Sequence, residues 1–163
     1  MAALRTYCIS GSNLTVANGI ATLVFINPSA TQGFRVLRAW AAQTAGAAGV
    51  QQRIQWSSQV TAFPTLTSAT PAKLNIGDAA SGITGNTTGA AGTCGINASA
   101  EGAGGKTAMI QDTFNTWSGY LWVATPDEQI VFQAGGAAGL GLVLPTAAAT
   151  LTGWQCGVIY QEI

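Results

Sequence analysis

Two segments of the sequence alternate apolar and polar side chains with a period of two, the pattern of a strand with one face in a core and one in water. In Val50–Val60, one face includes Ile54 and Trp56, while the opposite face is entirely polar. In Trp154–Gln161 the apolar side carries Trp154, Cys156, Val158 and Tyr160. We interpret both segments as antiparallel strands that lie on a hydrophobic core.

Further strand candidates are separated by residues that favour turns. They are Arg5–Ile9, Asn13–Ala17, Ile20–Ile26, Phe34–Ala42, Lys106–Asp112, Gly119–Ala124, Gln129–Gln133 and Leu140–Leu144. The pair Asn18-Gly19 between two apolar runs predicts a β-hairpin. Many short strands with frequent turns favour an all-β fold: one antiparallel β-sandwich domain over residues 1–163, jelly-roll-like, with no more than a turn or two of helix.

Residues 64–105 differ in composition from the rest of the chain, because threonine, serine, alanine, glycine and asparagine dominate. The large apolar residues that could anchor this segment are Leu66, Leu74, Ile76, Ile83 and Ile96. We expect a long Gly/Ala/Thr-rich loop excursion, and structureless loops of this length are unusual in a compact domain. Three interpretations stay open: local packing as an elaborated excursion, ordering against a neighbouring subunit, or a flexible surface loop.

The chain is poor in charge: 7% of its 163 residues are charged, the formal net charge is zero and the mean hydropathy is +0.31. Soluble domains carry about 25% charged residues. A zero balance argues against nucleic acid and anionic membranes as partners, and the apolar runs are too short to span a bilayer. We therefore expect other protein subunits to cover part of this uncharged surface.

The chain has three cysteines, Cys8, Cys94 and Cys156, and no histidine to join them in a zinc site. Residues 1–10 lack the apolar core of a secretory signal peptide. Cys8 and Cys156 fall in the first and last predicted strands, which makes them candidate neighbours. Buried free thiols are one interpretation, and a Cys8–Cys156 disulfide is the other.

The sequence offers no catalytic, cofactor-binding or metal-ligating candidate. Histidine, the commonest general base, is absent. Asp127 and Glu128 are adjacent on a predicted turn, so they point apart rather than across a cleft. Gly102–Thr107 resembles the end of a phosphate-binding loop, but Ala100 replaces the leading glycine and a strand follows. We predict that the protein is not an enzyme.

Aromatic and basic residues provide the candidate contact sites. Trp117, Tyr120 and Trp122 lie within six positions, and such a group serves a core, a subunit interface or a sugar-stacking platform. Trp117 and Gly119-Tyr120 adjoin a predicted turn and are expected to be partly exposed. Arg38 and Arg53 are expected on neighbouring strands, where they could meet an acidic surface of a partner.

Several segments in one order resemble small virion structural proteins of tailed bacteriophages. They are Thr70–Asp78, Gly92–Gly102, Trp117–Glu128 and Leu142–Pro145, together with Phe34–Trp40. The resemblance covers about the second half of the chain, in addition to Phe34–Trp40. The resemblance implies a head decoration (cement) protein, a β-sandwich made in the host cytoplasm and seated on the capsid surface. It also implies a homotrimer whose partners are the major capsid protein and copies of itself, and it carries no residue roles.

Two function hypotheses follow. The first is a non-enzymatic capsid decoration protein that self-associates and stabilises the head lattice, using interface residues among Arg38, Arg53, Trp117, Tyr120 and Trp122. The second is a receptor- or glycan-binding β module of a tail-fibre or lectin type, which requires Trp117, Tyr120 and Trp122 to be exposed together in a groove.

Overall fold

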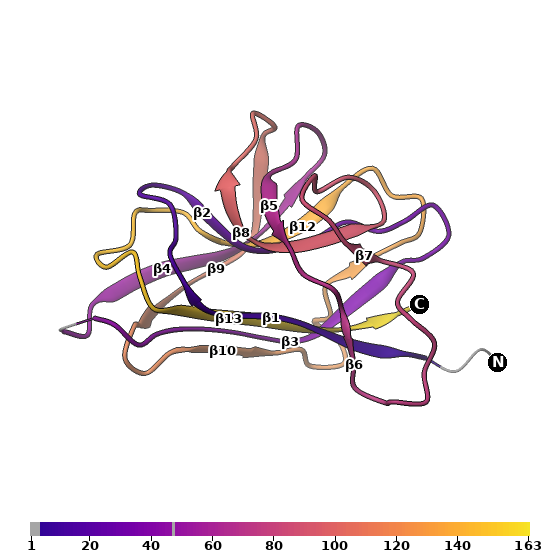
Figure 1. The fold of residues 1–163 in the computed structure, drawn as a ribbon, viewed down its shortest axis with the longest axis horizontal. Coiled ribbons are helices and arrows are strands. Elements are labelled where there is room, and N and C mark those ends of the chain that lie inside the picture. The colour runs from indigo at the N-terminus through magenta and orange to yellow at the C-terminus, as the bar shows by residue number, and fades with distance from the viewer. Residues whose placement is uncertain (1–3, 47) are drawn as a thin grey trace.

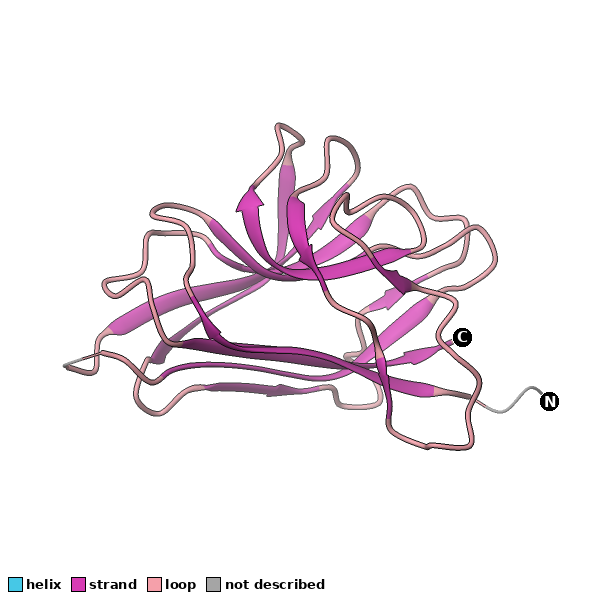
Figure 2. Cartoon of the chain, in the orientation of Figure 1, coloured by secondary structure: helices cyan, strands magenta, loops and turns pink. Residues whose placement is uncertain are grey.

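The computed structural model describes residues 4–46 and 48–163. Within these residues, all regular secondary structure consists of β-strands joined by loops, without a helix (Figure 2). It follows that this part of the chain holds no helix long and apolar enough to cross a membrane. The all-β prediction is confirmed.

Sheet A forms the lower layer in Figure 1. Its strands run in the order β10 (Tyr120–Val123), β3 (Phe34–Gln43), β13 (Trp154–Glu162), β1 (Thr6–Leu14) and β6 (Ala72–Lys73). The short β11 (Val131–Phe132) also pairs with β3. All of these pairings are antiparallel.

Sheet B forms the upper layer, which curves so that β5 and β8 rise away from sheet A (Figure 1). Its order is β5 (Thr65–Ser68), β8 (Thr93–Ala100), β2 (Ala21–Ile26), β12 (Gly139–Leu144), β4 (Gln51–Gln59) and β9 (Lys106–Asn115). The two-residue β7 (Thr84–Gly85) pairs parallel with β8, while the other pairs are antiparallel.

The core lies between the two sheets, as expected of a β-sandwich. Trp56 of β4 packs edge-on against Trp122 of β10, with ring centroids 5.6 Å apart. Phe114 of β9 packs edge-on against Trp154 of β13 at 6.3 Å. Each contact joins one sheet to the other, and the apolar sides of β4 and β13 face inward as their alternation predicts. The sandwich is confirmed, and jelly-roll connectivity stays a prediction.

The hairpin prediction at Asn18-Gly19 is wrong. β1 belongs to sheet A and β2 to sheet B, so this turn carries the chain from one layer to the other. All six residues of β2 are buried, and such a strand needs partners on both sides, which β8 and β12 provide. The two strands expected at 5–9 and 13–17 are mostly one: β1 continues to Leu14 through an irregularity between Gly11 and Leu14.

The expectation of one long loop over residues 64–105 is also corrected, because the segment contains β5, β6, β7 and β8. Its anchors behave in two ways. Leu66, Ile83 and Ile96 are buried, whereas Leu74 and Ile76 are exposed. The segment packs locally on both sheets and then leaves them as a loop between β6 and β7, which projects at the lower right of Figure 1.

Candidate interaction surface

The edge strands β9 and β10 lie on the same side of the sandwich. A short turn over residues 116–119 joins them, and Phe114 at the end of β9 packs on Tyr120 at the start of β10, with ring centroids 5.8 Å apart. In the described chain, β9 pairs only with β4 and β10 only with β3. Both strands therefore present an unpaired backbone edge, a feature that natural sheets usually protect.

Five apolar side chains on β9, β10, β11 and the turn between β9 and β10 are exposed, and we call them together the lateral patch: Met109, Trp117, Leu121, Val123 and Val131. Trp117, Leu121 and Val123 are 64%, 60% and 59% exposed. Single exposed apolar residues are ordinary, but a group of them marks an interaction site. Charged residues also lie here: Arg38 is opposite Val123, and Arg35 is opposite Val131. Exposed apolar side chains beside arginines are typical of a protein–protein contact, because interfaces are enriched in both.

The sequence of β10 explains why this patch exists. Tyr120, Leu121, Trp122 and Val123 are all large and apolar, and alternation along a strand sends two to each face. Tyr120 and Trp122 turn into the core, and Leu121 and Val123 turn outward. The signal was present in the sequence as an apolar run without a polar face.

The three predicted aromatic residues do not form one exposed group. Trp117 is exposed as predicted, and its indole Nε1 donates to the carbonyl oxygen of Gly46 at 3.4 Å. Trp122 is half-buried on Trp56, and Tyr120 is buried, which raises the pKa of its phenol to about 12. A shared stacking platform made by these three side chains is therefore wrong.

Arg38 and Arg53 lie in different sheets, so their expected placement on neighbouring strands is wrong. Both are exposed, and each stands beside one edge strand of the same side. Arg38 of β3 is opposite Val123 of β10, and its guanidinium lies 5.7 Å from the ring centroid of Trp40. Arg53 of β4 is opposite Thr113 of β9 and donates to Gln111 at 3.3 Å. The two arginines thus flank the unpaired edges from opposite layers.

The cysteines are free thiols. β1 and β13 are neighbours as predicted, but Cys8 is opposite Ile159 and Cys156 is opposite Gly11. Cys8 therefore shares the outer face with Ile159, while Cys156 points into the core, so a disulfide between them does not fit. Burial raises the pKa of both core thiols, Cys94 and Cys156, to about 12.

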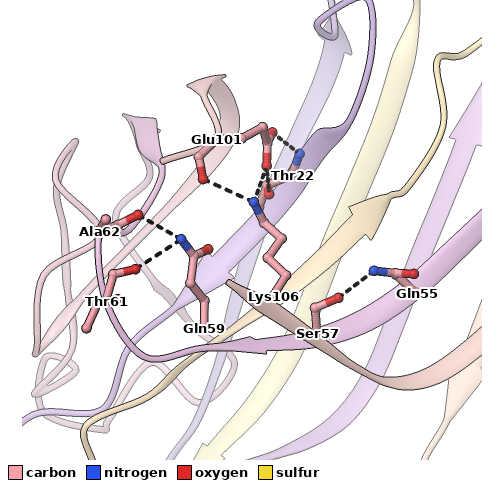
Figure 3. A network of polar contacts seen from close by, with 8 residues as sticks. All are labelled: Thr22, Gln55, Ser57, Gln59, Thr61, Ala62, Glu101 and Lys106. Carbon is pink, nitrogen blue, oxygen red and sulfur yellow. Dashed lines mark hydrogen bonds and ion pairs between the residues drawn. The ribbon is translucent and has the colours of Figure 1, made fainter. Parts of the chain in front are cut away.

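Glu101 and Lys106 form an ion pair that fastens the connection between β8 and β9 (Figure 3). Lys106 Nζ lies 2.9 Å from Glu101 Oε2 and donates to the Glu101 carbonyl oxygen at 3.0 Å. The Glu101 carboxylate also accepts from the backbone N–H (2.6 Å) and hydroxyl (2.5 Å) of Thr22 on β2. The glycine-rich 102–107 segment, which superficially resembles a phosphate loop, is thus the turn that returns Lys106 to Glu101.

A second polar cluster surrounds Glu162, which is buried at the end of β13. Its Oε1 accepts from the Ser81 hydroxyl at 2.6 Å and from the Gly82 N–H at 2.7 Å. Tyr160 lies 2.9 Å from the same hydroxyl; burial raises the pKa of Tyr160 and keeps its phenol protonated, so it donates to Ser81. These bonds hold residues 81–83 against sheet A.

A cavity of about 300 Å³ opens beside this cluster, between the two legs of the loop that joins β6 and β7. Pro71, Ala80 and Ile83 supply apolar lining, and Lys73, Ser81 and Thr84 supply polar lining. In the described part of the chain, His, Cys, Asp and Glu side chains form no group of three that could hold a metal ion.

Comparisons with protein-family models, curated proteins and solved structures found no match to this chain. The lateral patch and the cavity are therefore interpreted from their own geometry.

Proposed function

We propose that this chain is a non-enzymatic structural protein of a tailed-phage virion, a capsid decoration (cement) protein. In this proposal it assembles as a homotrimer, binds the major capsid protein on the capsid surface and stabilises the head lattice. The lateral patch is the observation that carries the proposal, because it exposes Leu121 and Val123 beside two unpaired sheet edges. Covering such a surface with another protein lowers the free energy of the system, because apolar area leaves water.

The charge distribution supports the same function. Of the twelve charged residues, Glu101 and Lys106 pair with each other and Glu162 is buried. The cores of protein interfaces are depleted in charge. A contact made by the lateral patch would therefore depend on apolar area and shape, as a permanent lattice contact does.

The experiment measures binding of the purified protein to phage heads that lack it, by co-sedimentation and electron microscopy. Leu121→Asp is expected to abolish binding, because a carboxylate in an apolar contact must be desolvated without a partner. Val60→Asp is the matched control, since Val60 is similarly exposed at the end of β4. Heads that never bind the wild-type protein, or that bind the Leu121→Asp variant equally well, would contradict the proposal.

The alternative, a receptor- or glycan-binding module of a tail-fibre or lectin type, has less structural support. It needs several aromatic faces in one groove, and the burial of Tyr120 leaves Trp117 as the exposed ring of the three. A glycan array compares the two functions directly. Binding of a sugar by the wild type and loss of that binding in Trp117→Ala would favour the alternative.

A further inference from the structure

The loop between β6 and β7 presents exposed apolar side chains. Ile76 is 92% exposed and Leu74 is 53% exposed, so neither side chain fills the cavity between the legs of its own loop. Loop tips normally carry polar residues or glycine, because apolar groups gain nothing from water there. We call residues 74–78 the loop tip.

The loop tip is ordered by its own hydrogen bonds. The Asn75 side-chain oxygen accepts from the Gly77 N–H at 3.2 Å, and the Asn75 carbonyl accepts from the Asp78 N–H at 3.0 Å. At the base, the Leu74 N–H donates to the Thr6 carbonyl at 3.1 Å, and the Tyr7 hydroxyl donates to the Ala79 carbonyl at 2.9 Å. A partner therefore meets Ile76 in a fixed position, which reduces the entropy cost of binding.

The cavity described above provides a receptor for such a side chain. It has about 300 Å³ of space, an apolar lining that includes Pro71, Ala80 and Ile83, and an opening between the legs of the loop. This space is large enough to admit a branched aliphatic side chain such as isoleucine, and the apolar part of the lining suits it. The chain thus carries both a protruding apolar side chain and an apolar cavity of suitable size.

The charges beside the two features are complementary. Lys73 lines the cavity, and Asp78 stands two residues from Ile76 on the loop tip. Among the described residues, neither of them forms an ion pair within the chain; the ion pair found there joins Lys106 and Glu101. An acidic group on the tip and a basic group at the cavity therefore offer an ion pair to a contact between two copies.

We infer that the loop tip of one copy of this chain inserts Ile76 into the cavity of a second copy, with Asp78 next to Lys73 at the rim. Each copy contributes one tip and one cavity, so the contact can repeat head-to-tail around a closed ring. This inference rests on the proposed self-association and names the contact that produces it. The lateral patch stays available for the capsid.

The experiment measures the oligomer dissociation constant of the full chain by sedimentation velocity. Ile76→Ser is expected to raise the dissociation constant about 10- to 100-fold for each tip–cavity interface, because one buried aliphatic side chain is removed from it. Ala80→Phe, which fills the cavity mouth, is expected to have the same effect. Ile20→Ser is the control, since Ile20 is exposed at the start of β2, and far-UV circular dichroism verifies that all variants fold.

Charge exchange tests the orientation of the contact. Lys73→Glu and Asp78→Lys are each expected to weaken the oligomer, because like charges then meet at the rim, and the double variant is expected to restore it. An oligomer that Ile76→Ser and the charge variants leave unchanged would overturn the inference, as would a wild-type monomer. Head binding is measured separately on the same variants: its loss in Leu121→Asp but not in Ile76→Ser reports on the proposed function alone.

Discussion

Gly157 of β13 lies beneath the indole ring of Trp40 on the outer face of sheet A, and replacing it with alanine tests how this face is stabilised. The two residues are directly opposite each other in the β13–β3 pair. A Cβ added at Gly157 would lie 2.5 Å from Cη2 and 2.7 Å from Cε2 of Trp40, and closer still to Cζ2. Ordinary van der Waals contacts begin at 3.4 Å, so the ring must leave its position.

Two effects set the size of the change. Overpacking of this kind destabilises by about 1–3 kcal/mol, while alanine in a strand recovers roughly 0.5–1 kcal/mol of backbone entropy relative to glycine. We expect Gly157→Ala to lower the free energy of unfolding by about 1–2 kcal/mol as the balance of these two effects. Part of the loss arises because the Arg38 guanidinium no longer has the ring beside it.

The assay is equilibrium urea unfolding followed by far-UV circular dichroism, with Gly105→Ala as the control because nothing lies within 4 Å of a Cβ added there. The same substitution is then made in a Trp40→Ala background. Without the indole ring, Gly157→Ala should be neutral or stabilising by up to about 1 kcal/mol. Equal destabilisation in both backgrounds would refute the contact with Trp40 as the cause.

Three further predictions concern the ion pair, the thiols and the contact with the head. Glu101→Gln should destabilise by roughly 1–3 kcal/mol in urea unfolding, since Lys106 loses its charged partner; exposed Glu128→Gln is the control, and equal effects would contradict the ion-pair role. The pKa of Cys94 and of Cys156 rises from 9.0 to about 12 on folding. The contribution of these thiols to the unfolding free energy should therefore be constant well below pH 9 and fall between about pH 9 and 12, by up to about 1.4 kcal/mol per pKa unit for each thiol. Burial also raises the pKa of Tyr120, so part of the fall should remain in a Cys94→Ala, Cys156→Ala double variant, and a fall of unchanged size there would contradict the origin in the thiols. Binding to heads should change little between about 0.05 and 0.5 M salt, because few ion pairs are available to screen; a steep loss in co-sedimentation would contradict an apolar contact.

The strands with strict alternation could be predicted from the sequence almost to the residue. The segment 50–60 became β4 (Gln51–Gln59), and 154–161 became β13 (Trp154–Glu162). A half-buried strand has apolar side chains on its core face and polar side chains on its solvent face. The local sequence is therefore sufficient to predict such a strand.

Strands that depend on a neighbour could not be predicted. β8 (Thr93–Ala100) consists mainly of small and polar residues and exists because β2 and β5 pair with it. Its one glycine also leaves room for another chain segment: a Cβ at Gly95 would lie 2.7 Å from the Thr67 carbonyl oxygen. The hairpin prediction at Asn18-Gly19 is wrong for the same reason. The local sequence specifies a turn there, whereas distant strands decide which sheet β2 joins.

The candidate interaction surface could likewise be predicted from the sequence only in part. The apolar run of β10 was visible in the sequence, but its period cannot tell which pair of side chains faces the core, and tertiary packing selected Tyr120 and Trp122. The cavity is lined by both ends of the 70–85 segment. Pairing of β6 with β1 holds one end, and the Ser81–Glu162 hydrogen bond, across eighty-one positions of the chain, holds the other. The proposed contact between Ile76 and the cavity of another copy could not be predicted from the sequence, which shows neither the exposure of Ile76 nor the cavity.

The two proposed contacts lie at opposite edges of sheet A, since its order begins at β10 and ends at β6. Because of this separation, one copy can contact the capsid through its lateral patch and, at the same time, contact a second copy of the chain through its loop tip. Once one copy is bound to the head, the copies linked to it are held near the head at a high effective concentration. A monomer has no such advantage. Ile76→Ser should therefore still bind heads but with at least tenfold weaker apparent affinity, a gap that multivalent binding readily produces, whereas Leu121→Asp should remain oligomeric and fail to bind. Co-sedimentation with heads measures both, and an Ile76→Ser variant that binds as tightly as the wild type would show that the two contacts do not cooperate.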